Sequence, residues 1–146
     1  MGTVWLTTSR KSMERKNNTS VDTNVLLRLV LNDVPEQTKL IERLLVGNVR
    51  YEVADLALTE MAFVLERFYK MERDIVTRFL LVIVQHPQFM CNKALFEQIL
   101  PLYLSEPALS INDCALLGYA RLNKATPLYT FDKKLVSKSG GDAVQP

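Results

Sequence analysis

Four carboxylates in this sequence lie beside apolar runs, each near the boundary of a predicted element. They are Asp22 in "SVDTNVLL", Glu60 in "LALTEMAFVL", Asp113 in "SINDCALL" and Asp132 in "PLYTFDKKL". An ionised carboxylate in such a place is costly unless it caps a helix, pairs with a charge or holds a cation. A cap is the simplest explanation for any one of them, because Asp is a preferred N-cap residue. The fourfold repetition weakens that explanation and indicates a shared chemical role.

If the four carboxylates converge, their chemistry is that of a divalent metal site. Two unit charges ~4 Å apart repel by about 4 kcal/mol at an effective dielectric constant near 20, and a divalent cation removes this conflict. Oxygen donors without neighbouring histidine or cysteine favour Mg²⁺ or Mn²⁺ over zinc. Such ions keep water molecules, and one of them can attack a phosphodiester. Metal-assisted hydrolysis of nucleic acid is the activity that this set of residues predicts.

The elements that would position the four acids alternate between strand-like and helix-like patterns. Strands separated by helices predict an α/β fold with a mainly parallel sheet, whose functional residues gather at the carboxyl ends of the strands. The predicted helices cover residues 25–31, 36–47, 58–69, 74–85, 94–100 and 111–125, and the predicted strands lie within residues 49–55, 88–91 and 126–132. Pro101 is expected to kink or interrupt the chain after the fifth helix.

Length, charge and cysteine content restrict the class of protein. The 146 residues suit one domain, and no apolar run approaches the ~18 residues that span a bilayer. The net charge of +2 comes from residues 1–16, and the remaining chain carries −1, so bulk charge does not argue for a nucleic-acid partner. Cys91 and Cys114 lack the spacing of a zinc site, which favours a reduced, cytoplasmic protein without membrane attachment.

The segments "VDTNVLL", "LTEMAFVLER", "INDCALLGYARLNKA" and "LYTFDKKL" together resemble the signature segments of PIN-domain nucleases. The resemblance is closest to the VapC-like toxins of type II toxin–antitoxin pairs and covers residues 21 to about 135. It implies a three-layer α/β/α fold and a Mg²⁺- or Mn²⁺-dependent ribonuclease. It also implies a homodimer whose active site is covered by the C-terminal segment of a small VapB-like antitoxin.

The resemblance places catalytic and metal-binding roles on Asp22, Glu60, Asp113 and Asp132, with Asn24 and Thr130 supporting them through hydrogen bonds. One feature departs from the family pattern: the strand before Asp22 should be apolar, but "NNTSV" has a single apolar residue. We expect an N-terminal arm or leader over residues 1–20, a PIN-like domain over residues 21–138, and a polar tail over residues 139–146.

Positive residues near the predicted site are candidates for RNA contact. Arg28 follows Asp22 on its helix, and Lys133 and Lys134 follow Asp132, although these lysines are more simply explained as solubilising charges. The charge run from Glu66 to Arg73 is interpreted as a solvated helix face.

Three other functions are alternatives to a metal-dependent ribonuclease. The first is a PIN fold that binds RNA or a partner without cutting, which the polar lead-in before Asp22 favours. The "DTN" segment also resembles the opening of haloacid-dehalogenase-type phosphatases, but that chemistry needs an acid where the chain has Asn24. A DNA nuclease of the flap-nuclease type needs helical additions for which the chain has no room.

The remaining reactive side chains support other roles. His86 is the only histidine, which excludes catalysis by paired histidines, and it lies at a predicted helix end. Cys114 is interpreted as a small core residue, because the sequence shows no base that would activate it.

Overall fold

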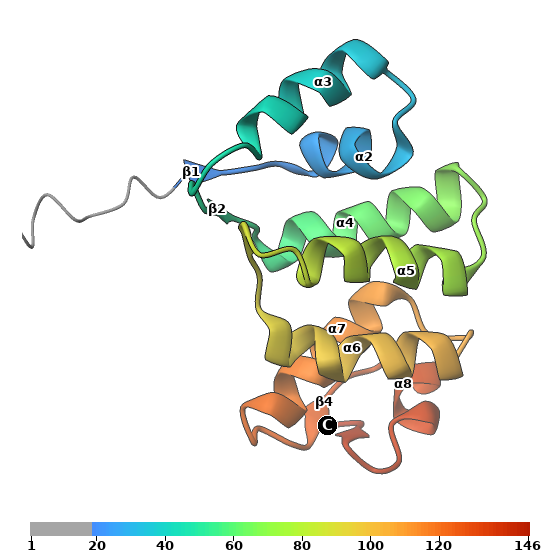
Figure 1. Ribbon diagram of the computed structural model, residues 1–146. Helices are drawn as coiled ribbons and strands as arrows, with labels where there is room; N and C mark the ends of the chain where they lie inside the picture. Colours follow the sequence, from blue (N-terminus) through green and yellow to red (C-terminus); the bar gives the residue numbers. More distant parts are fainter. Residues whose placement is uncertain (1–18) are drawn as a thin grey trace, which may run out of the picture.

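The computed structural model describes residues 19–146 (Figure 1). The expected N-terminal arm therefore lies outside the described residues, apart from Thr19 and Ser20. Three two-residue strands form a parallel sheet in the order β1-β2-β3, and the register aligns the first residue of each strand. These strands are β1 (Thr19–Ser20), β2 (Tyr51–Glu52) and β3 (Phe89–Met90).

Helices connect the strands, as parallel pairing requires. The described residues contain seven α-helices and one π-helical segment. In chain order these are α2 (Thr23–Leu31), α3 (Pro35–Leu44), α4 (Asp55–Phe63), η1 (Val64–Phe68), α5 (Arg73–Val84), α6 (Lys93–Ser105), α7 (Ile111–Leu122) and α8 (Lys133–Lys138). The predicted mixed α/β fold with a parallel sheet is confirmed.

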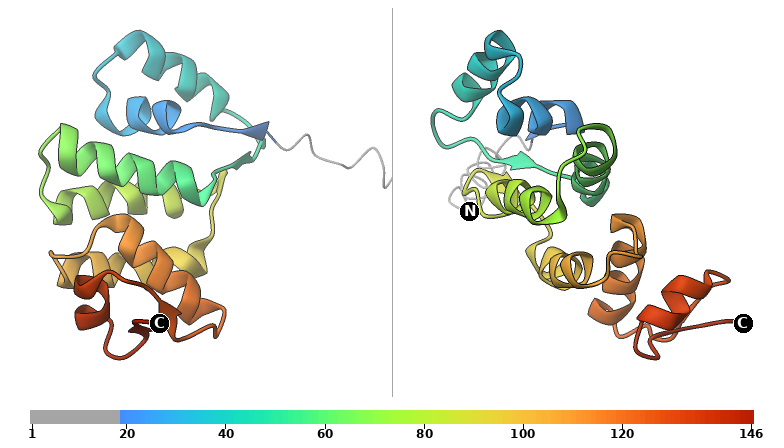
Figure 2. Two further views of the ribbon diagram at one scale, coloured as in Figure 1. Left: turned by 180° about the vertical axis from the view of Figure 1, so that it is seen from behind. Right: turned by 90° about the vertical axis from the view of Figure 1, so that its right-hand side faces the viewer.

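The last two strands form a second sheet of their own. β4 (Leu128–Tyr129) pairs in parallel with β5 (Ala143–Val144) and not with the first sheet. Both views of Figure 2 place α8 at the opposite end of the molecule from the α2–α3 pair. Residues 139–146, expected as a polar tail, thus supply a strand, and Ala143 is buried with its amide donating to Ser139 Oγ at 2.9 Å.

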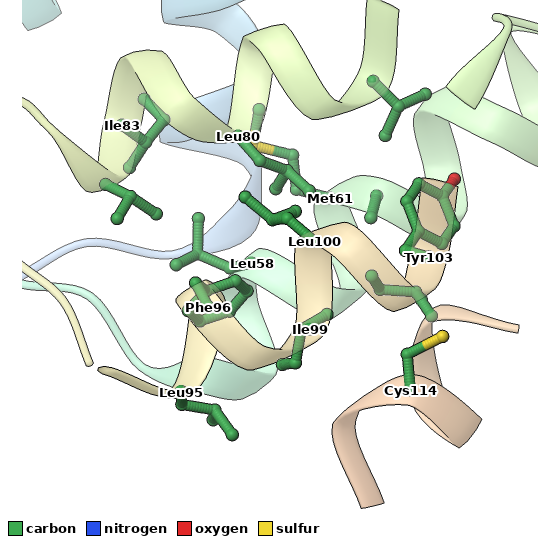
Figure 3. Close-up of a cluster of buried hydrophobic side chains, with 14 of the residues drawn as sticks. Leu58, Met61, Leu80, Ile83, Leu95, Phe96, Ile99, Leu100, Tyr103 and Cys114 are labelled. Carbon is green, nitrogen blue, oxygen red and sulfur yellow. The ribbon is translucent and has the colours of Figure 1, made fainter. Parts of the chain in front are cut away.

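The core lies between the middle helices. Figure 3 shows Leu58 and Met61 of α4 beside Leu80 of α5 and Phe96 of α6, and all four side chains are fully buried. Each contributes roughly 1.5–3 kcal/mol by leaving water. The expected inward placement of Cys114 is confirmed, and burial raises the pKa of its thiol to about 12.

Helix ends agree with the local sequence signals where those signals are strong. α2 ends at Leu31 with Asn32 as its C-cap in the left-handed conformation at φ 50°, and α3 begins at Pro35. Of the two effects expected of Pro101, a kink or an interruption, the interruption is wrong, because α6 continues through this residue to Ser105. Pro101 is exposed inside α6, and its neighbours Leu100 and Tyr103 are buried on the other side of the helix.

The charge run from Glu66 to Arg73 is a solvated face only in part: Arg67, Lys70 and Glu72 are exposed, but Glu66 and Arg73 are half-buried. Arg73 is only 15% exposed at its side chain and donates to Glu66 Oε1 at 3.1 Å. Its other nitrogens donate to the carbonyls of Tyr103, Glu106 and Leu109 at 2.7–3.2 Å. Since these carbonyls lie at and beyond the end of α6, Arg73 satisfies backbone groups that the helix leaves unpaired.

No helix within residues 19–146 has the length and apolar character to cross a bilayer.

Candidate functional site

Asp22 follows β1 directly and is the N-cap of α2. Its Oδ1 accepts a hydrogen bond from the Val25 amide at 3.0 Å, and its backbone is extended at φ −93° and ψ 176°. The residue is exposed and borders two hollows, one with Leu44 and Tyr51 and one with Arg28. The cap uses one carboxylate oxygen, while Oδ2 has no hydrogen bond to any residue in the described range.

Glu60 is the acid that the structure connects to the start of α2. Thr23 Oγ1 donates to Glu60 Oε2 at 2.8 Å, and the same hydroxyl lies 3.4 Å from the Ala57 carbonyl. Because Thr23 is the first residue of α2, this contact brings the "VDTN" segment beside the exposed face of α4. The sequence reasoning named Asn24 rather than Thr23 as the supporting residue. The sequence feature that could have identified Thr23 is its hydroxyl in the first turn after Asp22.

Asn24 and Arg28 both line the hollow beside Asp22. Arg28 makes a two-oxygen ion pair with Asp33 at 2.7 and 2.9 Å, and its Nε donates to Gln37 at 3.1 Å. The hydrogen bond to Asp33 is the main cause that raises the pKa of Arg28. This guanidinium is therefore committed to the α2–α3 connection, and its assignment to RNA contact stays a prediction.

Asp113 lies three residues into the first turn of α7 and forms a capping box with Ser110. Its Oδ2 accepts from the Ser110 amide at 2.9 Å, and its own amide donates to Ser110 Oγ at 3.1 Å. Two backbone donors at the helix start are satisfied by this exchange. The neighbouring Asn112 has no hydrogen bond to any described residue, and it faces the same hollow as Glu60.

Asp132 is the N-cap of α8. Its Oδ1 accepts from the amides of Lys134 and Leu135 at 2.9 and 3.3 Å, and its own amide donates to Thr130 Oγ1 at 3.0 Å. Lys133 and Lys134 are exposed in the first turn of that helix. Asp132 follows β4, which pairs with β5 and not with the first sheet, and it does not line the hollow beside Glu60.

A hollow of about 390 Å³ opens at the exposed face of α4 beside the start of α7. We call it the Glu60 hollow, and its lining residues are Leu56, Thr59, Glu60, Phe63 and Asn112. A hydrogen bond joins α4 and α7: the hydroxyl of Tyr119 in α7 donates to the carboxylate of Asp55 at the start of α4. This hydrogen bond also raises the pKa of Tyr119. The sequence reasoning did not identify Asp55, Tyr119 or Asn112.

The four acids can hold a metal ion only if they have suitable donor atoms and lie close together. The four acids are oxygen donors of the kind that Mg²⁺ and Mn²⁺ prefer. Their placement does not fit: between Thr19 and Pro146, no three His, Cys, Asp or Glu side chains lie close enough to hold an ion. Three of the four carboxylates instead accept hydrogen bonds from backbone amides at helix starts. The ligand assignment therefore stays a prediction.

The arrangement brings together two of the four predicted segments and the edge of a third. Thr23 joins the Asp22 segment to Glu60, and Asn112 places the start of α7 at the same hollow. Asp132 remains apart.

Comparison with known proteins gives one positive result. No curated protein and no solved structure matches the chain. A family model described as the PIN domain matches residues 20–140, which includes all four predicted acids and ends shortly after α8. Because the match covers most of the chain, this protein belongs to the PIN domain family.

Proposed function

We propose that this chain is an endoribonuclease that hydrolyses RNA phosphodiester bonds and requires Mg²⁺ or Mn²⁺. PIN domains are typically metal-dependent nucleases. The observation that carries the proposal for this chain is the hydrogen bond from Thr23 to Glu60, which joins two of the four predicted segments. Thr23 and Glu60 are 37 positions apart in the sequence, so only the packing of α2 against α4 brings them together.

Glu60 is the best placed of the acids to act on a substrate. The residue is exposed, and its Oε2 is held by Thr23. Its Oε1 has no hydrogen-bond partner within residues 19–146, so it can accept a hydrogen bond from a water molecule or from substrate. A carboxylate fixed at one oxygen and open at the other is suited to orienting a water molecule.

The metal requirement rests on family membership and on the acid types, not on the described positions. We therefore assign Asp22, Glu60 and Asp113 to the proposed site and derive no catalytic step through an ion. The resemblance adds Asp132 as the fourth acid, but this residue caps α8 next to the separate β4–β5 sheet.

A second candidate function is RNA or partner binding without cleavage. The observation that favours it is the use of Asp22, Asp113 and Asp132 as helix-start hydrogen-bond acceptors, which accounts for these acids without catalysis. The two functions differ in RNA cleavage. A nuclease cuts RNA and stops cutting when a catalytic carboxylate is replaced by an isosteric amide, whereas a binding protein does not cut RNA in either form.

The test is cleavage of a mixed pool of structured RNAs with Mn²⁺, with EDTA and with two variants. Glu60→Gln keeps the size of the side chain and removes its charge. Asp74→Asn is the matched control, because Asp74 is an exposed acid in the first turn of α5 and does not line the Glu60 hollow. We expect discrete fragments from the wild type and Asp74→Asn with Mn²⁺ only, and none from Glu60→Gln.

Two results would oppose the proposal. Cleavage by a purified Glu60→Gln variant at the wild-type rate would remove Glu60 from the site. A folded wild-type protein that cuts nothing in the pool, with either Mg²⁺ or Mn²⁺, would favour the binding function.

We further propose that the chain is a toxin, that it forms a homodimer, and that a small VapB-like antitoxin covers its site. These partners follow from the resemblance to VapC-like toxins. Growth arrest on expression of the wild type, relieved by Glu60→Gln, is the expected result. Equal growth arrest by both forms would separate toxicity from the proposed chemistry.

A further inference from the structure

We propose that the Glu60 hollow binds one unstacked base of a single-stranded RNA, with the ring of Phe63 stacking on the base and the Asn112 amide bonding to its edge. This inference rests on the proposed function, because it places the base beside the acid that we assign to the reaction. It adds a contact that selects single-stranded over paired RNA.

Phe63 is the aromatic side chain of the hollow. It follows Glu60 by three residues on α4, which places both on one face of the helix. Leu58 and Met61 form the core-facing side of α4 and are fully buried, whereas Phe63 is 52% exposed. Its ring therefore presents an apolar surface to the hollow without serving the core.

Asn112 supplies the hydrogen-bonding group. An amide has two donor hydrogens and an acceptor oxygen, which is the combination that base edges complement. In the described part of the chain, nothing else bonds to this side chain. Thr59 is not an alternative, since its hydroxyl donates to the Leu56 carbonyl at 3.1 Å.

The chemistry of the lining favours a base over a phosphate. The lining residues include no lysine and no arginine, while Glu60 would repel an anion. The exposed Leu56 and Phe63 instead fit a flat, uncharged ring. Since RNA bases offer such a face only when unpaired, the hollow is suited to a loop, a bulge or an end.

The experiment measures binding of a short fluorescent single-stranded RNA by anisotropy, in EDTA so that no cleavage occurs. We expect Phe63→Ala and Phe63→Leu each to weaken binding roughly tenfold, because stacking on an aromatic ring contributes on that order per base. Phe63→Trp should bind at least as well as the wild type. The control is Phe68→Ala: Phe68 is 78% exposed on η1 and does not line the hollow.

A second measurement uses RNAs that carry one abasic position each. At one position, loss of the base should weaken wild-type binding to the extent that Phe63→Ala does, and it should leave the Phe63→Ala protein unaffected. The same position should lie within a few nucleotides of the cleaved bond.

The outcomes separate this inference from the proposed function. If the wild type cleaves RNA but Phe63→Ala binds like Phe68→Ala, the base site is wrong and the nuclease stands. An equal loss in Phe63→Leu and Phe63→Trp would also contradict stacking. If the folded wild type neither binds nor cleaves RNA, both proposals fail, and the exposed apolar residues of the hollow become a surface for a protein partner.

Discussion

Asp22 has two roles that respond differently to the same substitution. As an N-cap it needs an oxygen that accepts from the Val25 amide, and asparagine supplies one almost as well as aspartate. As a member of the proposed site it needs the negative charge, which asparagine lacks. The cap and the chemistry can therefore be measured separately at one position.

We predict that Asp22→Asn unfolds at the same denaturant concentration as the wild type but loses RNA cleavage. Asp22→Ala should also lose cleavage and in addition lose about 1 kcal/mol of unfolding free energy, because the cap hydrogen bond disappears. Urea unfolding and a cleavage assay with Mn²⁺ give the two values. Wild-type cleavage by a stable Asp22→Asn protein would show that Asp22 is a cap alone.

At the scale of the elements, the sequence predicts where helices begin and end better than it predicts contacts between residues far apart in the chain. The C-cap of α2 at Asn32 and the start of α3 at Pro35 depend on the backbone preferences of single residues, so they can be predicted from the sequence. The role of Arg73 depends on carbonyls 30–36 residues away, which no local pattern reveals. The interpretation of the charge run as a solvated face is therefore wrong at Glu66 and Arg73, which form a partly buried ion pair.

Arg73 joins η1, α5 and the end of α6, so we predict that Arg73→Lys destabilises the fold. Lysine keeps the charge but cannot direct several donors in one plane toward Glu66 and the carbonyls of Tyr103 and Leu109. Losing these charge-assisted hydrogen bonds should lower the unfolding free energy by about 2–3 kcal/mol. The control is Arg67→Lys, because Arg67 is exposed on η1 and should change stability by less than ~0.5 kcal/mol. Equal stability of the two variants would contradict the assigned role.

At the scale of the whole molecule, the division into two sheets determines which acids can cooperate. The candidate site could be predicted in part: the sequence named Glu60 and the adjoining segments of Asp22 and Asp113, which α2, α4 and α7 bring to one region. The position of Asp132 could not be predicted, because each β4 residue can pair with any strand of suitable direction. Two-residue strands carry too little sequence to specify that partner.

We predict from this arrangement that the four acids contribute unequally to cleavage. Glu60→Gln should lower kcat/KM by at least about 100-fold, a loss of ~2.7 kcal/mol in transition-state stabilisation. Asp132→Asn should keep kcat/KM within about fivefold, because Asp132 caps α8 between the strands of the separate β4–β5 sheet and asparagine preserves the cap. Steady-state cleavage of one defined RNA measures both. A comparable loss in a folded Asp132→Asn protein would require β4 and α8 to pack beside β1 when RNA is cut, so that all four carboxylates meet.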